Sequence, residues 1–527
     1  MIVHPESKSL LLRVKNPDLI KKCIPNYSRD IDYEGHNLVV KHDLDVVKVL
    51  RNMGINAPSP IRQHYDWPRP AWFSKIFDHQ VITADFLTLT HRGFVLNEMG
   101  TSKTASALWA CDYLMRIGKL KKVLIASPLS TLERVWMDEI FNVIMRRKAV
   151  MLYGTAERRL ELLKSDADFY VINHDGLKII ANEVKKRKDI ELVIVDEAAA
   201  YRNASTNRYK ILLNMLRTDM KLWLMTGTPC PNDPTDAWAL AKLVNPSRVP
   251  VYFNSWKRQT MNQISTYKWV PKPGSHQMAY DAMQPAVRFK KADCLDLPPI
   301  TFESRTCDLT PEQKQAYKDM KNYLAADLAT AELAAGTQQI TAVNAADKIN
   351  KLRQILCGVV KDPATDTYLP LNHTPRVQVL KECIEQASHK VIVIVPFKGI
   401  IRYLRTELEK DFTCEVLNGD VPPKQRAAII KKFKDEDDPR VLLCHPKVMA
   451  HGLTLTEADT TIFYAPIYSN EETQQVIERI NRPGQRFKMT IIRIGASALE
   501  WSIYAIVEGK RLSQESILDL YRKELTT

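Results

Sequence analysis

The sequence predicts an α/β protein with two parallel-sheet units, a helical insertion between them and a small α+β module at the N-terminus. Short apolar runs, such as 192–195 and 391–395, alternate with longer helical stretches. Strands that are covered by helices on both faces of a sheet have this composition. An Ala-rich stretch without strand patterns, at about 310–358, interrupts the alternation. A chain of 527 residues is also too long for one hydrophobic core.

The N-terminal module is predicted to cover residues 1–56. Its apolar patterns read as strand, helix, strand and helix, at 9–16, 17–24, 37–43 and 44–55. The order strand, helix, strand, helix is typical of a small domain whose helices pack on one sheet.

The remaining boundaries follow from composition. The Pro-rich segment 57–72 is predicted as a linker. We expect the first parallel-sheet unit at 73–300, the helical insertion at 301–370 and the second parallel-sheet unit at 371–527.

Charge and cysteine usage limit the function classes. Lys and Arg outnumber Asp and Glu by 75 to 61, a net charge of +14. Cationic surface binds polyanions by releasing counterions, which favours a nucleic-acid partner over a merely basic soluble protein. The nine cysteines are scattered without a C-x-x-C pair, so we expect no zinc site and no disulfide framework. No apolar run is long enough to span a bilayer, and a soluble, cytoplasmic protein is expected.

Residues 97–108 (NEMGTSKTASAL) have the outline of a phosphate-binding loop. An apolar strand leads into a turn with Gly100, and Lys103 and Thr104 open a helix. Backbone N–H groups at a helix start bind phosphate, while such a lysine and hydroxyl serve the β/γ-phosphates and Mg²⁺. Asn97 and Ser102 stand where the usual pattern has glycine, so a chance match is the alternative.

Three further segments suit the same chemistry. A buried strand ends in Asp196 and Glu197, a pair that can hold Mg²⁺ and polarise water. Another strand runs into a Thr-Gly-Thr-Pro turn at 226–229. In the second unit, Arg479 and Arg482 are three residues apart and are expected on one face of a helix, where they could neutralise a phosphate. Taken singly, each has a plain alternative: an exposed strand end or a solvated basic helix end.

In their order, these segments resemble the core of superfamily 2 helicases, and within it the Swi/Snf-type DNA translocases. The resemblance covers residues 73–510. The motifs that carry it are FDHQ (77–80), NEMGTSKT (97–104), ASPLSTLERVWMDEI (126–140), DEAAAYRNASTNRY (196–209), LMTGTPCPN (224–232), VMAHGLTLTEADTTIFYAP (448–466) and QQVIERINRPGQ (474–485). It implies two RecA-like lobes that share one ATP and a Mg²⁺ ion.

The resemblance also implies roles for particular residues. It implies catalytic roles for Lys103, Glu197, Arg479 and Arg482. The implied ATP contacts are Gln80, Met99, Gly100, Thr101, Ser102, Lys103, Thr104 and Ala105, and the implied metal ligands are Thr104 and Asp196. Coupling roles are implied for Thr226, Gly227, Thr228 and Gln475, and DNA contacts for Ser127, Pro128, Ser130, Gly452 and Thr454.

Two departures from the family pattern bear on turnover. Ser102 replaces a glycine, and Ala199 stands where a histidine is usual. We expect ATP binding to be kept and hydrolysis to be slowed.

The implied function is ATP-driven movement on double-stranded or forked DNA by a monomer, in replication, recombination or repair. An ATP-responsive DNA-binding switch and an RNA helicase stay as alternatives. Residues 1–56 faintly resemble the HARP-type module of annealing helicases, and a small packing or partner-binding module is the alternative. The compact chain suits a bacterial or phage protein.

Overall fold

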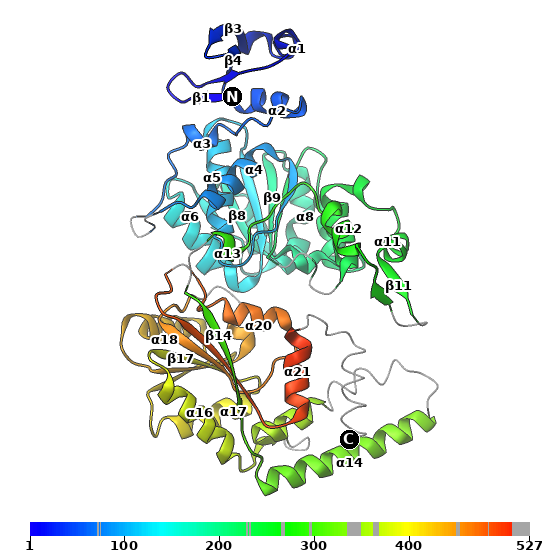
Figure 1. The fold of residues 1–527 in the computed structure, drawn as a ribbon, viewed down its shortest axis with the longest axis vertical. Coiled ribbons are helices and arrows are strands. Elements are labelled where there is room, and N and C mark those ends of the chain that lie inside the picture. Colours follow the sequence, from blue (N-terminus) through cyan, green and yellow to red (C-terminus); the bar gives the residue numbers. More distant parts are fainter. Residues whose placement is uncertain are drawn as a thin grey trace. The chain divides into compact units, whose positions relative to one another are not determined.

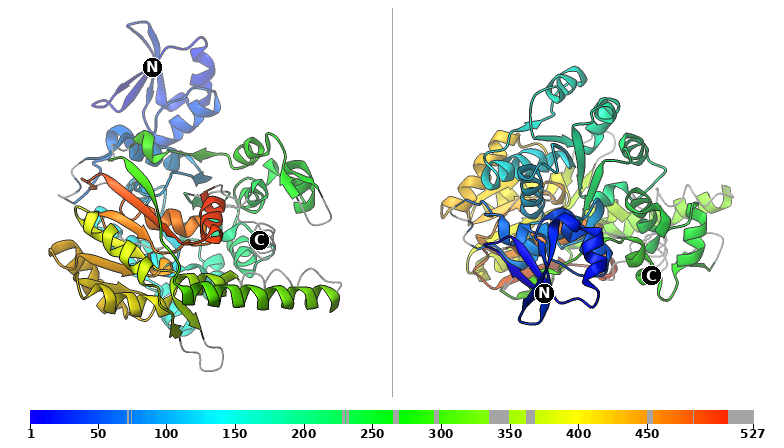
Figure 2. Two further views of the ribbon diagram at one scale, coloured as in Figure 1. Left: turned by 60° about the horizontal axis from the view of Figure 1, so that its bottom comes forward. Right: turned by 90° about the horizontal axis from the view of Figure 1, so that it is seen from above.

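The protein folds into two compact units, Met1–Leu295 and Asp296–Thr527. The computed structural model describes residues 1–70, 73, 75–227, 230, 233–264, 269–294, 298–334, 349–361, 368–449, 454–482 and 484–508. Each unit is built on a parallel sheet with helices on both faces (Figures 1 and 2). The predicted α/β class with two parallel sheets is therefore confirmed.

The N-terminal module of the first unit is a four-stranded antiparallel sheet in the order β1-β2-β4-β3. Its elements are β1 (Ile2–His4), β2 (Ser9–Leu12), α1 (Pro17–Cys23), β3 (Ser28–Tyr33), β4 (His36–Lys41) and α2 (Leu44–Asn52). The sequence pattern predicted β2, β4 and both helices but neither edge strand. Edge strands pack little apolar surface, and SRDIDY in β3 carries one aliphatic residue among charged ones.

The connecting segment after this module is itself folded onto the first unit. Ser59 donates its backbone N–H to Asp85 at 2.6 Å, and the Tyr65 hydroxyl donates to Asp112 at 2.7 Å. The indole of Trp109 donates to the carbonyl of Pro68 at 2.8 Å. The prolines that mark a linker in the sequence here shape a packed segment that includes α3 (Ile61–His64).

The large sheet of the first unit has the order β13-β5-β10-β9-β6-β8-β7. The strands are β5 (Arg92–Val95), β6 (Lys122–Ser127), β7 (Ala149–Met151), β8 (Phe169–Asn173), β9 (Ile190–Asp196), β10 (Lys221–Met225) and β13 (Ala286–Val287). Alternate residues of β9 enter two different cores: Val193 and Val195 join one, and Leu192 and Ile194 join the other. Both faces of the sheet are thus buried, as its apolar strands require.

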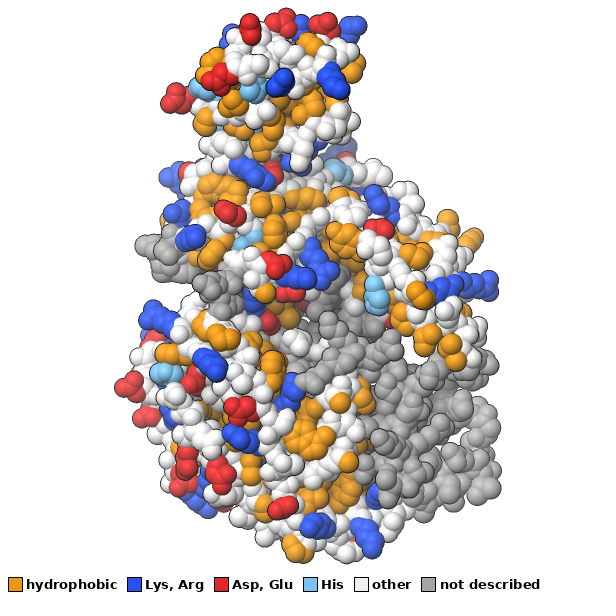
Figure 3. All heavy atoms as spheres, viewed as in Figure 1, with side chains coloured by type: hydrophobic (Ala, Val, Ile, Leu, Met, Phe, Trp, Pro, Cys, Tyr) orange, Lys and Arg blue, Asp and Glu red, His pale blue; other side chains and the backbone are white. Residues whose placement is uncertain are grey.

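Helices on the two faces complete this unit. They are α4 (Asp78–Leu89), α5 (Lys103–Arg116), α6 (Asp138–Val143), α7 (Ala156–Leu163), α8 (Leu177–Lys186), α9 (Asn207–Met215), α10 (Ala237–Val244) and α13 (Lys291–Cys294). An excursion between β10 and β13 adds α11 (Phe253–Thr260), β11 (Met261–Gln263), β12 (Trp269–Pro271) and α12 (Ser275–Ala282). Apolar and basic side chains lie together on the surface of the first unit (Figure 3). In this region of the chain, Tyr252 and Tyr280 are exposed.

The sheet of the second unit has the order β14-β21-β20-β17-β19-β18. The strands are β14 (Ile300–Thr306), β17 (Lys390–Ile394), β18 (Cys414–Leu417), β19 (Val441–Cys444), β20 (Ala458–Phe463) and β21 (Met489–Gly495). β14 pairs in parallel with β21 from Ile300 opposite Met489 to Thr306 opposite Gly495. This strand falls in the range predicted as the start of the helical insertion, because only Ile300 and Phe302 of ITFESRT are apolar and the segment lacks a buried-strand signature.

The predicted helical insertion contains α14 (Pro311–Ala334) and a small hairpin of β15 (Val359–Lys361) and β16 (Tyr368–Pro370). The other helices of the unit are α16 (Thr374–Gln386), α17 (Lys398–Leu408), α18 (Pro423–Asp435), α19 (Pro446–Met449), α20 (Asn470–Ile477) and α21 (Ala498–Glu508). Within the described residues, every helix is too short or too polar to cross a bilayer.

Candidate functional site

Four parallel strands of the first unit end at one edge of the sheet, and each is followed by a predicted motif. β5 leads into the loop at 97–102, β6 ends at Ser127, β9 ends at Asp196, and β10 leads into Thr226 and Gly227. The carboxyl edge of a parallel sheet is the usual ligand-binding edge of α/β proteins. The topology therefore gathers segments that are far apart in the sequence.

The loop at 97–102 is closed by Lys103, whose Nζ donates to the carbonyls of Asn97 and Glu98 at 3.0 and 3.1 Å. Two residues of this loop have left-handed backbone conformations: Gly100 has a φ of 80° and Ser102 has a φ of 53°. Glycine adopts this conformation freely, whereas a residue with a Cβ is destabilised by roughly 1–2 kcal/mol. Ser102 thus keeps the backbone shape of a glycine loop at an energetic cost.

The other predicted nucleotide contacts lie in the same loop and the first turn of α5. Met99, Gly100 and Thr104 are half-buried, and Thr101 and Ala105 are buried. The Thr101 hydroxyl donates to the carbonyl of Glu98 at 2.8 Å. These contacts fix the loop and leave Thr104 partly accessible at the helix start.

Helix α4 and the segment before α13 anchor this loop through residues that motif reasoning missed. Asn97 donates to the Thr83 hydroxyl at 2.9 Å and accepts the backbone N–H of Phe289 at 3.0 Å. Burial lowers the pKa of His79, and because its partner at 3.1 Å is the Thr101 carbonyl, the neutral ring carries its proton on Nε2. An amide at 97, where glycine is usual, therefore has a structural reason.

Gln80 on α4 is buried, and its two side-chain polar atoms differ in their hydrogen bonding. Its Oε1 accepts the backbone N–H of Phe77 at 2.9 Å, whereas its buried Nε2 has no hydrogen-bond partner within the described residues. Leaving a buried donor unsatisfied costs about 1–3 kcal/mol. The adenine contact that the sequence predicts for Gln80 stays a prediction.

Asp196 ends β9 and is held by donors from three directions. Its Oδ2 accepts the indole N–H of Trp136 at 3.0 Å, and its Oδ1 accepts the backbone N–H of Glu197 at 3.1 Å. Burial raises the pKa of Asp196, while the charge of Lys103, the indole and the hydroxyl of Ser127 oppose that rise. The structure thus brings Lys103 and Asp196 into one electrostatic neighbourhood.

Glu197 and the turn after β10 also lie at the carboxyl edge of the sheet of the first unit. Glu197 has a left-handed backbone with φ of 54°. Thr226 is buried and donates its N–H to Val95 at 3.0 Å. A Cβ added to Gly227 would lie 3.1 Å from Cγ and 3.2 Å from N of Met99, so a larger residue would crowd the loop at this turn. Thr228 lies outside the described residues.

The predicted DNA contacts of the first unit are not all on the surface. Ser127 is fully buried, and its hydroxyl lies against that of Thr131 as well as Asp196. It therefore faces the carboxylate rather than solvent. Pro128 is half-buried, and the side chain of Ser130 is outside what the structure describes.

The arginines of the second unit do not lie on one face of a helix, and that prediction was wrong. α20 ends at Ile477, so both arginines lie after the helix, in the turn and bend that follow it. Arg479 is buried and donates from Nε to the carbonyl of Met449 at 2.8 Å. Gln475 is buried on α20.

Arg482 and Thr454 meet within this unit. Arg482 donates to the carbonyl of Glu478 at 2.9 Å and to the Thr454 hydroxyl at 3.1 Å, and burial lowers its pKa to about 10. The residues predicted to contact phosphate and DNA are thus in direct contact. Gly452 lies outside the described residues.

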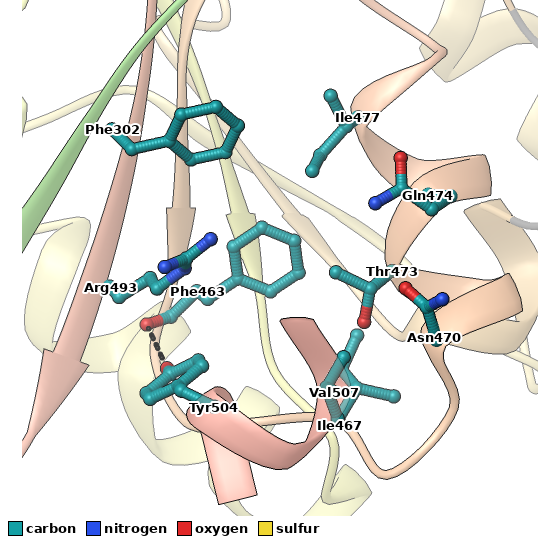
Figure 4. Close-up of a pocket in the computed structure, with 10 residues that line it drawn as sticks. All are labelled: Phe302, Phe463, Ile467, Asn470, Thr473, Gln474, Ile477, Arg493, Tyr504 and Val507. Carbon is teal, nitrogen blue, oxygen red and sulfur yellow. Dashed lines mark hydrogen bonds between the residues drawn. The ribbon is translucent and has the colours of Figure 1, made fainter. Parts of the chain in front are cut away.

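A cavity of about 230 Å³ lies on another side of α20 (Figure 4). Aromatic and aliphatic side chains, one arginine and three polar groups line it: Phe302, Phe463, Ile467, Asn470, Thr473, Gln474, Ile477, Arg493, Tyr504 and Val507. The Tyr504 hydroxyl donates to the carbonyl of Phe463 at 3.3 Å beneath it. None of the predicted site residues lines this cavity, so it is separate from the candidate site.

The metal-binding potential is that of a nucleotide site. Across the described part of the chain, no group of three or more His, Cys, Asp and Glu side chains could hold a metal ion. Mg²⁺ is commonly bound by one or two protein oxygens together with substrate phosphates. The Thr104 hydroxyl and the Asp196 carboxylate, at the edge that holds Lys103, fit a magnesium–nucleotide better than a metal alone.

Comparison with known families and structures places these motifs in context. The family described as SNF2-related domain matches residues 42–359, more than half of the chain, and the Helicase conserved C-terminal domain matches residues 375–484. A solved structure, the Sulfolobus solfataricus SWI2/SNF2 ATPase core in complex with dsDNA, is 18% identical with a TM-score of 0.39, and the match covers 86% of this chain and 94% of that one.

Several proteins are similar along most of this chain. Putative protein p41 of Acyrthosiphon pisum secondary endosymbiont phage 1 is 23% identical over 474 residues, which cover 86% of this chain and 97% of p41. TATA-binding protein-associated factor MOT1 of Saccharomyces cerevisiae is 24% identical over 481 residues, 78% of this chain but 25% of MOT1. Uncharacterized ATP-dependent helicase MG018 of Mycoplasma genitalium is 24% identical over 409 residues, 76% of this chain and 38% of that protein. The chain therefore spans about a quarter of the yeast protein and nearly all of the phage protein.

Proposed function

This chain belongs to the SNF2-related family with a helicase C-terminal domain, and from that premise we propose that it is an ATP-driven motor that moves along double-stranded or forked DNA. The observation that carries the proposal is the electrostatic interaction of Lys103 with Asp196 at one sheet edge, and the unsatisfied amide of Gln80 on α4 supports it. A base-reading donor, a phosphate-binding lysine and a metal-binding carboxylate are the parts that an ATPase of this kind needs.

In the proposed mechanism, Lys103 exchanges the carbonyls of Asn97 and Glu98 for phosphate oxygens of ATP. Thr104 and Asp196 would hold Mg²⁺, which would supply positive charge next to the phosphates. Glu197 orients the attacking water. Arg479 and Arg482 of the second unit neutralise the charge that develops on the γ-phosphate.

Coupling to movement is proposed to start at the contact between Gly227 and Met99. The close approach of Gly227 to Met99 supports this step, since a change in the phosphate loop would press on the turn after β10. Thr226, Thr228 and Gln475 are proposed to carry this change onward, and Pro128, Ser130, Gly452 and Thr454 to contact the DNA backbone.

The DNA substrate is supported by the family and by the net charge of +14. A role in replication, recombination or repair, and an annealing-type role for residues 1–56, are parts of the same proposal. The similarity to p41 along nearly all of that phage protein supports a phage or bacterial setting, and we propose a monomer in the cytoplasm.

The test is steady-state ATP hydrolysis without nucleic acid and with single-stranded, duplex, forked and RNA ligands. Turnover is expected to rise on duplex or forked DNA and to vanish in Lys103→Ala. Lys186→Ala, which removes an exposed lysine paired with Glu183 on α8, is the control and should behave like the parent protein. Stimulation by RNA above that by DNA would point to an RNA helicase instead.

A second candidate is an ATP-responsive DNA-binding switch with little hydrolysis. The left-handed Ser102 and the buried methyl group of Ala199, where a histidine is usual, favour it. This function would be accepted if ATP changed DNA affinity while no ligand stimulated turnover, and if Lys103→Ala abolished that change in affinity.

A further inference from the structure

Trp136 is a buried donor that faces the carboxylate of Asp196 across a gap of sixty positions in the sequence. Its side chain has no exposed surface, and its Nε1 lies 3.0 Å from Oδ2. Apart from the indole nitrogen, tryptophan has no polar side-chain atom. The one directional bond that this large side chain makes therefore ends on the proposed metal ligand.

The backbone that presents Trp136 is unusual. The residue lies in a π-helical turn, η3 (Leu132–Met137), which continues into α6. A π turn holds one extra residue, so side chains after it leave the helix axis in a direction changed by about 100°. Such turns are frequent at functional sites, and here the turn accompanies an indole aimed at a carboxylate.

The same stretch of chain supplies a second donor. Ser127 ends β6 and is fully buried, and its hydroxyl interacts with the Asp196 carboxyl and opposes the rise in its pKa. Thr131 lies against Ser127 through its own hydroxyl. The segment from Ser127 to Trp136 thus binds the carboxylate from two points.

We propose that Trp136 is a positioning residue for the binding of Mg²⁺. Its indole N–H holds Oδ2 of Asp196 and so fixes the plane in which the remaining lone pairs of the carboxylate face the metal. This inference rests on the proposed ATPase function. A carboxylate turns easily about its last torsion, and it has about four lone-pair sites, so one N–H bond restricts it without filling it. Groups that orient metal ligands in this way typically change metal affinity 10- to 100-fold when they are removed.

The test compares two buried tryptophans. Trp136→Phe removes the N–H and keeps most of the ring volume. Trp223→Phe is the matched control, because Trp223 is equally buried in β10 of the same sheet but donates to the carbonyl of Thr90, at 3.2 Å. For each variant, Mg²⁺ is titrated at fixed fluorescent ADP to find the half-saturating concentration for nucleotide binding, and thermal unfolding is recorded.

The half-saturating Mg²⁺ concentration is expected to rise about 10-fold in Trp136→Phe and to stay within twofold of the parent in Trp223→Phe, with similar losses of melting temperature. An unchanged Mg²⁺ requirement in Trp136→Phe, or equal shifts in both variants, would overturn the inference. If Trp136→Phe does not fold, Ser127→Ala decides: a rise of roughly threefold supports the positioning of Asp196 by this segment, and no rise overturns it.

The parent protein separates the two levels of the argument. If it binds no ADP at any Mg²⁺ concentration, the proposed function fails and the inference fails with it. If it binds ADP with Mg²⁺ and the variants behave alike, the proposed function stands and only the role of Trp136 is lost.

Discussion

At the scale of single residues, the candidate site holds two non-glycine residues in left-handed backbone, Ser102 and Glu197. Each follows a strand of the same sheet, and each lies next to a group with a proposed role, Lys103 or Asp196. Strained conformations of this kind persist only where surrounding contacts enforce them, and they gather at functional sites. Glycine at position 102 would release one of the two strains.

Ser102→Gly is therefore expected to raise the free energy of unfolding by up to ~1 kcal/mol, because relief of left-handed strain outweighs the greater entropy of glycine in the unfolded chain. Calorimetry measures this. Ser106→Gly, in the interior of α5, is the control and should lower stability by about 1 kcal/mol. ATP turnover of Ser102→Gly should rise as well. A loss of stability in Ser102→Gly would contradict the strain argument.

Single residues of the candidate site could be predicted from the sequence only where they belong to a known motif. Lys103 and Asp196 were predicted and do lie in one neighbourhood, whereas their catalytic roles stay predictions. Asn97, His79 and Trp136 were missed as parts of the site, because their partners are a carbonyl, a hydroxyl or a carboxylate far away in the chain. The one available signal was the polar Asn97 at a position that usually has glycine.

At the scale of elements, the second unit is fastened by a buried ion pair between α16 and α21. The Arg376 guanidinium donates to both oxygens of Glu500, at 2.6 and 2.7 Å, and the two side chains are 1% and 0% exposed. Arg376→Met should lower the free energy of unfolding by about 3–5 kcal/mol, because it leaves a buried carboxylate without its partner.

The double variant Arg376→Met/Glu500→Leu is expected to be more stable than Arg376→Met alone, since it removes the unpaired charge. Denaturant unfolding of the parent, both single variants and the double variant gives the coupling energy. Losses that simply add would show that the pair contributes no interaction of its own.

A second element-scale prediction concerns pH where the N-terminal module meets the rest of its unit. His42, at the end of β4, is buried, and its Nε2 lies 3.0 Å from the carbonyl of Pro58. Burial lowers the pKa of His42, with Asp43 and Asp85 opposing it, and the ring of His64 lies 5.2 Å away.

Because the folded pKa of His42 is lowered, the unfolded chain binds the proton more readily. Stability is therefore full above the ordinary value of about 6.5 and falls as the pH drops below it, by on the order of 1 kcal/mol. Thermal unfolding at pH 8.0 and 5.5 measures the loss, and His42→Gln should lose less between the two. Equal losses would assign the effect to other groups.

Element boundaries were predictable where apolar patterning was strong and not where it was weak. The strands β9 and β17 contain the uninterrupted apolar runs 192–195 and 391–394 and were evident, whereas most residues of β14 and β3 are polar. The end of α20 was misjudged because a spacing of three was read as a helix, whereas the helix ends at Ile477, before both arginines.

At the scale of the whole molecule, the proposed grip on DNA is electrostatic. The logarithm of the binding constant should fall linearly with the logarithm of the salt concentration, by about 0.9 for each phosphate contacted, and alike for unrelated sequences of equal length. Fluorescence anisotropy measures the slope. Lys431→Ala/Lys432→Ala, on the exposed side of α18, should leave it unchanged. A slope that differs between sequences would contradict a backbone-directed grip.

The α/β class and the presence of two parallel sheets were predictable because both follow from local patterning. How the chain distributes its strands between the sheets was not, since pairing of β14 with β21 joins segments at opposite ends of the second unit. Nothing in a local window of ITFESRT reports that partner.

That pairing fixes an order of assembly during synthesis. The sheet of the first unit is complete once β13 has left the ribosome, and domains fold as units from the N-terminus onward. β14 emerges next but has no partner until β21 follows, with nearly all of the second unit still to be made in between. For that interval β14 has no partner strand, and an unpaired segment of this kind can associate with neighbouring chains on a polysome.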